Sequence, residues 1–360
     1  MFFGYPIAAV AENWLHECLV GMVTAVHARL DAGQPPAAWP TNIPTAHRAR
    51  LRLKHGLCDR LNAYAAAAEG LAPAQRAQVL ICLNQQNAIA GLVSCVSNCA
   101  CLTDLPAPIR EPATDLFVFA FKLLTDLDVR DAHYAIIYNT LGSKVCPFCA
   151  LEYFDAPGAP REDLDHYLAV SRYPFAAVNL RNLTPMGMKC NERHKRDGDI
   201  LRDAAGNRRL SFDPYADREI HVSLLNSIPF PQADGHPQWR IEFVPDSPEC
   251  ITWNSVFDIR TRITRDVLNP SFGDWLGSFA RWFVTYKGSG DVSNDRIISS
   301  LGDYCIVLLD MRLTARDALR LPVFQMIERR CSNGDNRLLA LMRDLVTRSV
   351  PQRPAVARNM

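Results

Sequence analysis

The sequence lacks an excess of charge of either sign. Its 39 Lys and Arg residues face 38 Asp and Glu residues, which leaves a formal net charge of +1 over 360 residues. Because a phosphate backbone attracts clustered cations rather than an average, a nucleic-acid-binding surface has to be a local patch. The chain also lacks internal repeats and low-complexity segments, which excludes the repeat architectures.

Long hydrophobic runs and a basic amino-terminus are absent too. No apolar run approaches the roughly 18 residues that a membrane-spanning helix needs, so we expect a soluble protein with no membrane partner. No Lys or Arg precedes Glu12, a pattern that argues against a secretory signal and favours a cytoplasmic protein. In a reducing cytoplasm the 12 cysteines would stay free or bind metal rather than form disulfides.

What is present is an ordinary globular composition in a long chain. Hydrophobic residues make up 48% of it and charged residues 21%, which excludes wholesale disorder. A domain usually takes roughly 100–200 residues, so this length predicts two or three domains. We expect a helical domain over 1–140, a module rich in Cys, His and Asp over 141–215, and a mainly helical domain over 216–360. The expected fold class is therefore α+β, in a mostly helical protein.

Apolar residues at three- and four-residue steps predict the helices. Before residue 141 they cover Ala49–Glu69, Pro73–Val96 and Thr114–Leu127, with proline-rich breaks at Gln34–Pro44 and Leu105–Pro112. After residue 215 we expect a strand pair at Trp239–Val244 and Cys250–Phe257. The later helices are expected at Trp275–Phe283, Asp295–Asp310, Leu313–Arg330 and Leu338–Thr347, and Ser349–Met360 is expected to fray.

Residues 141–215 carry an ordered set of metal-ligand and base side chains. The segment Cys146-Pro147-Phe148-Cys149 has the spacing that lets two thiolates meet one tetrahedral zinc ion. Asp165-His166, Asn182 and Cys190-Asn191-Glu192-Arg193-His194-Lys195 follow. Charge is segregated as well, since residues 150–165 carry one base and five acids, and residues 166–209 carry nine bases and four acids. Such a split suits a site that binds a cation and then an anionic backbone.

In this order the motifs resemble the HNH nuclease family, which has a ββα-metal fold. The subtype that the chain most resembles has CPxC, LDHYLP, a Tyr-Pro pair, NLVP and CN in sequence, followed by a Pro-Tyr element, here Pro214-Tyr215. Each element alone is weak, but five in order within residues 146–215 are specific. A weaker similarity surrounds Trp253–Arg262. The resemblance implies a central ββα-metal module that carries a zinc knuckle.

The resemblance also implies roles for four residues. Asp165 would be a metal ligand at the end of the first strand, and His166 the general base that activates water. Asn182, on the second strand, would fix the loop that aims His166, and Asn191, on the following helix, would complete the protein's hold on the metal. The chemistry agrees, because imidazole suits a base near neutral pH and oxygen ligands suit Mg²⁺ or Mn²⁺.

The chain departs from the subtype at Ala169 and Gly187, and these departures leave the role of His194 open. Ala169 replaces a usual Pro, and Gly187 replaces the first Cys of a second CxxC pair. The structural zinc set would then be Cys146, Cys149 and Cys190, with its fourth ligand unassigned. His194 fits three roles, since its spacing from Cys190 and Asn191 allows it to complete the zinc set, bind the catalytic metal, or contact phosphate.

The spacing of the other cysteine, basic and aromatic residues predicts whether they contact nucleic acid, pack in the core or face solvent. The residues expected to contact nucleic acid are Arg172, Lys189, Arg193, Lys195 and Arg196. Packing is the preferred reading of the cysteines Cys95, Cys99 and Cys101 and of the aromatic residues Trp275, Phe279, Trp282 and Phe283. A solvated helix face is preferred for Arg48, Arg50, Arg52, Lys54 and Arg60.

These expectations combine into a metal-dependent HNH endonuclease that hydrolyses phosphodiester bonds, with DNA preferred over RNA as the nucleic-acid partner. By analogy alone, the role would be that of an effector in bacterial phage defence. The helical regions would provide a regulatory, partner-binding or homodimerising scaffold. Two rivals remain open: an RNA-cleaving HNH nuclease, and a non-catalytic zinc-stapled protein that binds nucleic acid or regulates.

Overall fold

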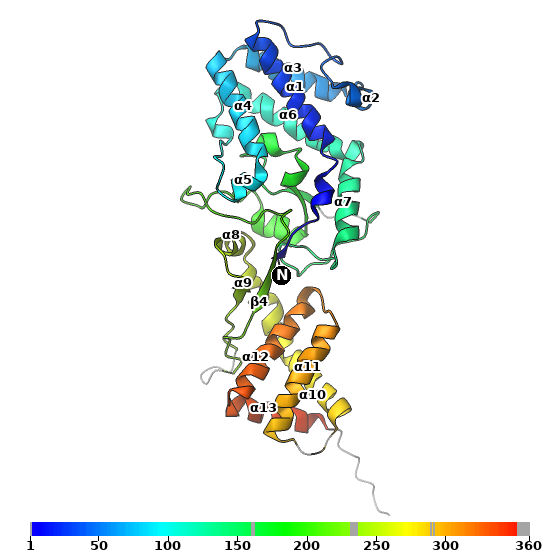
Figure 1. Ribbon diagram of the computed structural model, residues 1–360, viewed down its shortest axis with the longest axis vertical. Helices are drawn as coiled ribbons and strands as arrows, with labels where there is room; N and C mark the ends of the chain where they lie inside the picture. The colour runs from blue at the N-terminus through cyan, green and yellow to red at the C-terminus, as the bar shows by residue number, and fades with distance from the viewer. Residues whose placement is uncertain (1, 160–162, 231–236, 289, 291, 351–360) are drawn as a thin grey trace, which may run out of the picture. The chain divides into compact units, whose positions relative to one another are not determined.

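The computed structural model describes residues 2–159, 163–230, 237–288, 290 and 292–350 (Figure 1). They form two compact units. The N-terminal unit comprises Phe2–Glu219 and Ser247–Phe257, and the C-terminal unit comprises Ile220–Asp246 and the residues from Asp258 onward. The prediction of a mostly helical α+β protein is confirmed at this level of detail.

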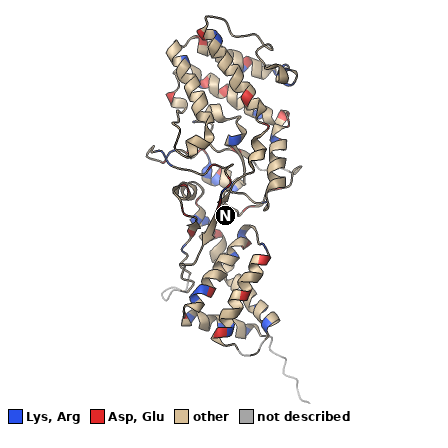
Figure 2. Ribbon diagram, viewed as in Figure 1, with Lys and Arg blue, Asp and Glu red and all other residues tan. Residues whose placement is uncertain are grey.

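Helices make up most of the N-terminal unit. They are α1 (Trp14–Asp31), α2 (Arg48–Leu51), α3 (His55–Glu69), α4 (Pro73–Asn87), α5 (Ile89–Val93), α6 (Ala107–Asp126), α7 (Val129–Thr140) and α8 (Pro248–Phe257), together with the short strand β1 (Phe2–Phe3). Basic and acidic side chains are interspersed over these helices (Figure 2), and the two signs are equal in number before residue 146.

Several of the expected helix boundaries were wrong. The proline-rich break at Leu105–Pro112 is confined to Leu105 and Pro106, because α6 begins at Ala107 and contains Pro112. Pro108, the second residue of α6, costs little because the first backbone N–H groups have no partner within the helix, whereas Pro112 lies inside the helix and removes one of its hydrogen bonds. The segment Ala49–Glu69 is interrupted between α2 and α3, whereas the break expected at Gln34–Pro44 is present.

A β-hairpin follows the helices in the chain. Strand β2 (Asp163–His166) pairs antiparallel with β3 (Leu183–Met186), so that Asp165 faces Thr184 and His166 faces Leu183. The π-helix η6 (Lys189–Lys195) comes directly after β3. Two strands and a helix therefore follow one another in the order that the sequence motifs led us to expect.

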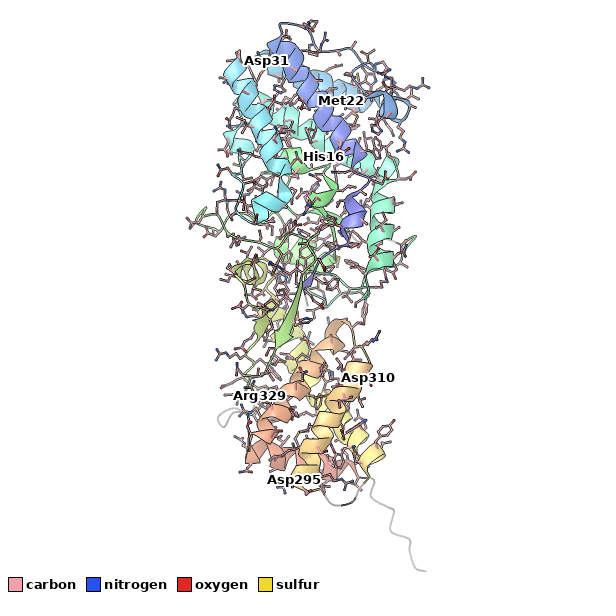
Figure 3. The ribbon with its side chains drawn as sticks, in the orientation of Figure 1. His16, Met22, Asp31, Asp295, Asp310 and Arg329 are labelled. Carbon is pink, nitrogen blue, oxygen red and sulfur yellow. The ribbon has the colours of Figure 1, made fainter. Side chains whose placement is uncertain are left out.

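The hairpin and the helices share one hydrophobic core. Met22 of α1 (Figure 3) is 1% exposed and belongs to the same buried cluster as Leu183 of β3. Phe117 of α6 meets Phe175 of the β2–β3 loop edge to face, with ring centroids 5.2 Å apart. Residues 1–140 and 141–215 consequently form one unit rather than two domains, because a hairpin this short has too little apolar surface for a core of its own.

The segment Cys250–Phe257 was expected to be a strand and is helical instead. Helix α8 begins at Pro248, which suits a first helical position, and carries Glu249 in its first turn. Trp253 and Phe257, four residues apart, are both buried. The Trp253 indole Nε1 donates to the Phe148 carbonyl at 2.7 Å, so α8 packs against the Cys146–Cys149 segment.

The C-terminal unit combines a strand pair with a helical bundle. Strands β4 (Glu219–Ser223) and β5 (Glu242–Val244) pair antiparallel. The helices are α9 (Ile259–Ile263), the π-helix η7 (Thr264–Leu268), α10 (Asn269–Lys287), α11 (Asn294–Asp310), α12 (Arg320–Ser332) and α13 (Asn336–Ser349). Phe279 of α10 is fully buried against Tyr304 and Phe324, which confirms core packing for the centre of the aromatic group Trp275–Phe283.

The C-terminal tail and the hydropathy of the helices bear on two of the expectations. Of the tail expected to fray, residues 351–360 lie outside the described residues. Within the part of the chain that the structure describes, none of the helices is both long enough and apolar enough to cross a membrane.

Candidate functional site

The β2–β3 hairpin places the predicted catalytic residues beside one another. Asp165 and His166 are the last two residues of β2, and the backbone N–H of Tyr167 donates to the Asn182 carbonyl at 2.8 Å. Asn182 was expected on the second strand, and it instead ends a short 3-10 turn (Leu180–Asn182) immediately before β3. Antiparallel pairing thus brings residues 165 and 182 to the same end of the hairpin.

The Asn182 side chain ties the loop between the two strands to the hairpin. It is fully buried, and its Oδ1 accepts a hydrogen bond from the Leu168 backbone N–H at 2.7 Å. Its Nδ2 donates to the carbonyls of Leu168 at 3.3 Å and Ala176 at 3.1 Å. Three hydrogen bonds from one amide therefore fix both ends of the segment from Leu168 to Ala176.

That loop in turn orients His166. The Nε2 atom of His166 lies 3.0 Å from the carbonyl oxygen of Ala177, directly after the segment that Asn182 fixes. A carbonyl oxygen can only accept, so Nε2 carries the proton in the neutral ring and Nδ1 keeps its lone pair. The ring also packs against Phe121 of α6, with centroids 4.3 Å apart.

The environment of His166 keeps its imidazole neutral. Its pKa is lowered to about 4: burial is the main cause, the hydrogen bond to the Ala177 carbonyl acts in the opposite direction, and the charge of Lys195 adds to the lowering. At pH 7 the ring is therefore unprotonated at Nδ1 and able to accept a proton. It has the tautomer and charge state that a general base requires.

Asp165 is paired with a buried lysine. The Nζ atom of Lys195 lies 2.8 Å from Asp165 Oδ2, and the Lys195 and Asp165 side chains are 1% and 12% exposed. The same ammonium group donates to the His166 carbonyl at 2.7 Å. The expectation that Lys195 contacts phosphate was wrong, because the side chain is buried. Its ammonium group instead pairs with Asp165, the predicted metal ligand.

Lys195 is the main residue of the site whose place the sequence analysis missed. The run from Lys189 to Arg196 reads as a solvated basic stretch, and a lysine in it is usually exposed. In the structure η6 is a π-helix, whose last bond joins the Arg196 N–H to the Asn191 carbonyl at 2.8 Å. Its buried positions are Cys190 and Lys195. Asp165, a carboxylate beside the apolar Leu164 in the predicted strand, was the available signal, since a carboxylate that becomes buried needs a cation.

The other predicted site residues lie on or near the same π-helix. Asn191 and His194 are half-buried on η6, whereas Arg193 and Arg196 are exposed. Lys189 is half-buried, and the Arg172 side chain is 55% exposed, with its guanidinium 3.9 Å from Asp199. Four of the five predicted nucleic-acid-contacting residues thus keep a side chain at least partly accessible.

Three cysteines converge beside this module. The Sγ atoms of Cys146, Cys149 and Cys190 all lie within 4.8 Å of one another, and all three residues are buried. Among the residues described, this is the group of His, Cys, Asp and Glu side chains able to hold a metal ion. Zn–S bonds of about 2.3 Å in a tetrahedron separate the sulphurs by about 3.8 Å, so the cluster is compatible with zinc after a small contraction.

The backbone around the first two cysteines forms a tight knuckle. The Cys146 N–H donates to the Glu152 carbonyl at 2.8 Å, and the Ala150 N–H donates to the Cys146 carbonyl at 2.7 Å. Leu151 N–H points at Cys149 Sγ from 3.4 Å, and Ala150 adopts a positive φ of 51° to turn the chain. Burial raises the pKa of the Cys146 thiol well above its ordinary value, with the other two thiols adding to the effect. Metal binding at this cluster would therefore release protons.

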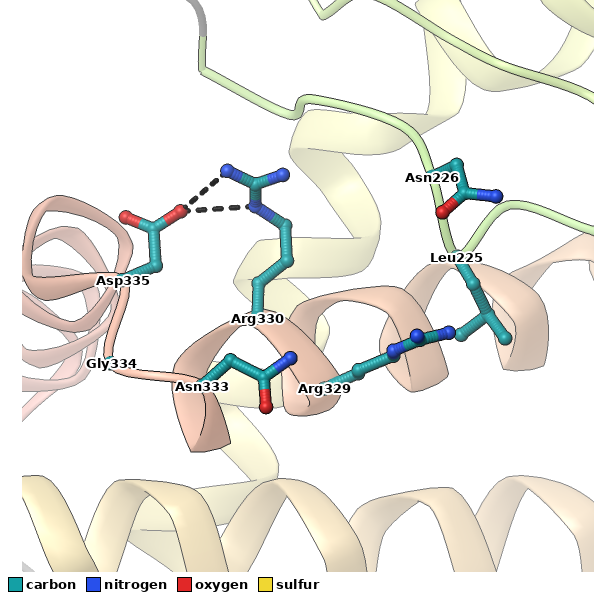
Figure 4. Close-up of a pocket in the computed structure, with 7 residues that line it drawn as sticks. All are labelled: Leu225, Asn226, Arg329, Arg330, Asn333, Gly334 and Asp335. Atoms are coloured by element: carbon teal, nitrogen blue, oxygen red, sulfur yellow. Dashed lines mark hydrogen bonds and ion pairs between the residues drawn. The ribbon is translucent and has the colours of Figure 1, made fainter.

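A separate polar pocket lies in the C-terminal unit. It has a volume of about 570 Å³ and is lined by Leu225, Asn226, Arg329, Arg330, Asn333, Gly334 and Asp335 (Figure 4). The Arg330 guanidinium is held by the Asp335 carboxylate at 2.8 Å, and the other Asp335 oxygen accepts from the Leu338 N–H at the start of α13. Because Asp335 neutralises Arg330 and caps a helix, these contacts serve the packing of α12 against α13.

Within the described residues, the candidate functional site therefore consists of the cysteine cluster and the hairpin with Asp165, His166 and Asn182. Its geometry has to support any assignment by itself. No family model, no curated protein and no solved structure matches this chain.

Proposed function

We propose that this protein is an HNH-type endonuclease that hydrolyses phosphodiester bonds, most readily in DNA. The observation that carries the proposal is the geometry of His166, whose Nε2 lies 3.0 Å from the Ala177 carbonyl oxygen, so that the ring is aimed and Nδ1 is left as the proton acceptor. Its position beside Asp165, on a hairpin whose loop is fixed by the amide of Asn182, adds support.

In this proposal His166 acts through Nδ1. Nδ1 takes a proton from a water molecule as the water oxygen attacks phosphorus, and the Ala177 carbonyl stabilises the resulting imidazolium through Nε2–H. The phosphorus–oxygen bond on the opposite side breaks, and the leaving oxygen takes up a proton. Asn182 makes no contact with the reacting atoms in this scheme; it keeps the His166 ring from rotating.

Asp165, Asn191 and His194 are the residues that would hold a catalytic cation. Mg²⁺ or Mn²⁺ bound there would place positive charge beside the phosphate. The donor set fits only if the ammonium of Lys195 shares or vacates the Asp165 carboxylate, since the two groups are 2.8 Å apart. Lys195 is thus a built-in competitor for the cation, and it already supplies one positive charge to the site.

The two remaining elements of the proposal are zinc and nucleic acid. Cys146, Cys149 and Cys190 would hold a structural Zn²⁺ that fastens the knuckle to η6. The exposed guanidinium groups of Arg193 and Arg196, on and directly after η6, would contact phosphate. The helices of both units would regulate or dimerise the enzyme, as in an effector of phage defence, and the protein would act in the cytoplasm.

One observation favours a second candidate, a zinc-stapled module that binds nucleic acid without cutting it. The Asp165–Lys195 ion pair satisfies the carboxylate inside the protein without any metal. Each group of such a buried pair compensates the charge of the other, so the pair persists without a metal.

A plasmid-nicking assay separates the two candidates. Wild type and His166→Ala would be incubated with supercoiled plasmid in Mg²⁺ and in Mn²⁺, with linear single-stranded DNA, double-stranded DNA and RNA alongside. Loss of a general base should slow cleavage by roughly 10²–10⁴-fold. His55→Ala is the matched control, because His55 is exposed at the start of α3 in the same unit.

The outcomes are distinct. Nicking by wild type and His55→Ala, but not by His166→Ala, supports the nuclease. Preferential cleavage of RNA changes the substrate and keeps the mechanism. If wild type leaves every substrate intact in both metals, the non-catalytic candidate replaces the nuclease.

A further inference from the structure

The cysteine cluster provides three of the four ligands that a tetrahedral metal site requires. Cys146 and Cys149 come from the knuckle and Cys190 from η6, so the open position lies between these two segments. His194 is the partner that the sequence suggests for it. The structure brings a different side chain to the junction of the two segments, that of Glu152.

Gly187 shows where the Glu152 carboxylate lies. A Cβ atom on Gly187 would stand 2.6 Å from Glu152 Oε2, 3.1 Å from its Cδ and 3.2 Å from its Cβ. A side chain at position 187 would require Glu152 to move, and the φ of Gly187 is not in the left-handed range, so the backbone itself does not require glycine there. The space taken by Glu152 therefore explains the glycine.

Gly187 also precedes Cys190 by three residues, which is the spacing of Cys146 and Cys149. A thiol at position 187 would point its sulphur into the region that Glu152 Oε2 occupies. The carboxylate oxygen thus stands close to where the first residue of a ligand pair with Cys190 would place its donor atom. Carboxylate oxygen is an ordinary zinc donor.

The main chain holds Glu152 against the metal-binding knuckle. Its carbonyl accepts the Cys146 N–H at 2.8 Å, and the adjacent residues Val145 and Tyr153 form an antiparallel bridge. Glu152 is therefore directly opposite Cys146 across the knuckle. The tight group within 4.8 Å consists of the three sulphurs, so the carboxylate reaches the ion by rotation about its side-chain bonds.

We propose that Glu152 is the fourth ligand, so that the site is a Cys₃Glu centre built from Cys146, Cys149, Cys190 and Glu152. Gly187 makes room for the carboxylate. His194, one turn further along η6, is then left for the phosphate or the catalytic cation. This inference concerns the structural metal and does not depend on nuclease activity.

The test measures metal binding by the full-length chain. Zinc affinity would be determined by competition with a chromophoric chelator, and the ligand set from the absorption of the Co²⁺-substituted protein. Glu152→Ala should weaken zinc binding at least as much as loss of an outer-shell partner does, roughly 10–100-fold, and should leave the three-thiolate charge-transfer intensity unchanged. His194→Ala should bind zinc as wild type does.

A pair of double variants distinguishes a ligand from a packing residue. In the Glu152→Ala background the space beside Gly187 is empty, so Gly187→Cys should restore the affinity and raise the charge-transfer intensity from that of three thiolates to that of four. Gly187→Ala in the same background fills the space without supplying a donor and should restore nothing.

Each alternative result overturns the proposal. Unchanged affinity in Glu152→Ala would assign the fourth position to water, and loss of affinity in His194→Ala would assign it to that histidine. Equal rescue by Gly187→Ala and Gly187→Cys would make Glu152 a packing residue. A wild-type chain that takes up neither Zn²⁺ nor Co²⁺ would remove the centre altogether, whatever the plasmid assay shows.

Discussion

Replacing Lys195 by Met removes the ammonium group from Asp165 and keeps most of the apolar stem that η6 buries. The ion pair is 2.8 Å long, and the Lys195 side chain is 1% exposed. Breaking a buried pair by removing one partner costs about 3–5 kcal/mol, because the other charge stays behind without compensation. Asp165 keeps 12% of its side-chain surface exposed to water, so we expect a loss of about 3 kcal/mol, at the lower end of that range.

Hydrogen exchange measured by mass spectrometry is the suitable assay, because the chain has two compact units and a single unfolding free energy is not defined for it. Peptides covering β2 and η6 should exchange roughly 100-fold faster in Lys195→Met, since each 1.4 kcal/mol is about a factor of ten. Peptides of the C-terminal unit provide the internal control and should not change.

A double-mutant cycle isolates the pair. In an Asp165→Asn background there is no carboxylate to leave uncompensated, so Lys195→Met should cost much less there than in wild type. If the substitution costs the same in both backgrounds, or costs under about 1 kcal/mol in wild type as an exposed pair would, the two side chains do not form the buried pair described above.

The same variant tests the competition between Lys195 and a divalent cation. With the ammonium gone, Mn²⁺ should bind the vacated carboxylate and slow exchange in Lys195→Met more than in wild type, because a ligand stabilises in proportion to its occupancy of the folded state. Equal protection of both proteins by Mn²⁺ would show that Lys195 does not compete for the metal position.

Three further predictions address the fold around the site. Burial lowers the pKa of His27 from 6.5 to about 4, so the folded protein binds fewer protons than the unfolded one between these values; stability should be full above pH 6.5 and fall as the pH drops toward 4, by about 3 kcal/mol for this residue. Hydrogen exchange of the α1 and α3 peptides at pH 7.5 and pH 5 measures the loss of stability, which should be smaller in His27→Gln than in wild type; an equal loss in both proteins would show that the ring titrates normally. Asn182→Ala leaves the Leu168 N–H and carbonyl without their side-chain partners and should destabilise the N-terminal unit by about 2–4 kcal/mol; a loss below about 1 kcal/mol would mean that water replaces the amide. Removing metal with a chelator should raise exchange at the knuckle and in η6 together, because Cys190 links them, whereas a rise at the knuckle alone would contradict a shared metal.

The hairpin could be predicted from the sequence because its determinants are local. Asp165-His166 and Asn182 lie close along the chain, and antiparallel pairing of two short strands leaves few ways to arrange them. The ordered motifs led to the Asn182 amide holding the loop beside His166, an arrangement that the contacts of Leu168 and Ala177 now describe in detail. Its catalytic meaning remains a prediction.

The residues that could not be placed depend on distant contacts or on unusual backbone. Lys195 belongs to a basic run, and only the π-helical turn of η6 and the approach of β2 bury it. Helix α8 follows β4 and β5 in the sequence. It nevertheless packs against Phe148, which lies more than a hundred residues earlier in the chain. No periodicity within Cys250–Phe257 could show that packing, and its aromatic and β-branched residues suit a strand equally well.

The cysteine cluster and the catalytic candidates are physically coupled through η6. Cys190 near its start faces the knuckle, and Lys195 at its end holds Asp165 of β2 and the His166 carbonyl. A π-helix of seven residues is too short to be stable by itself, because helix nucleation is costly and its gain comes from tertiary contacts. A metal bound at Cys190 would fix the first turn, and the buried ion pair fixes the last. Metal binding at the knuckle would therefore contribute to the position of the ammonium group that neutralises Asp165, and through Asp165 to the end of the strand on which His166 lies.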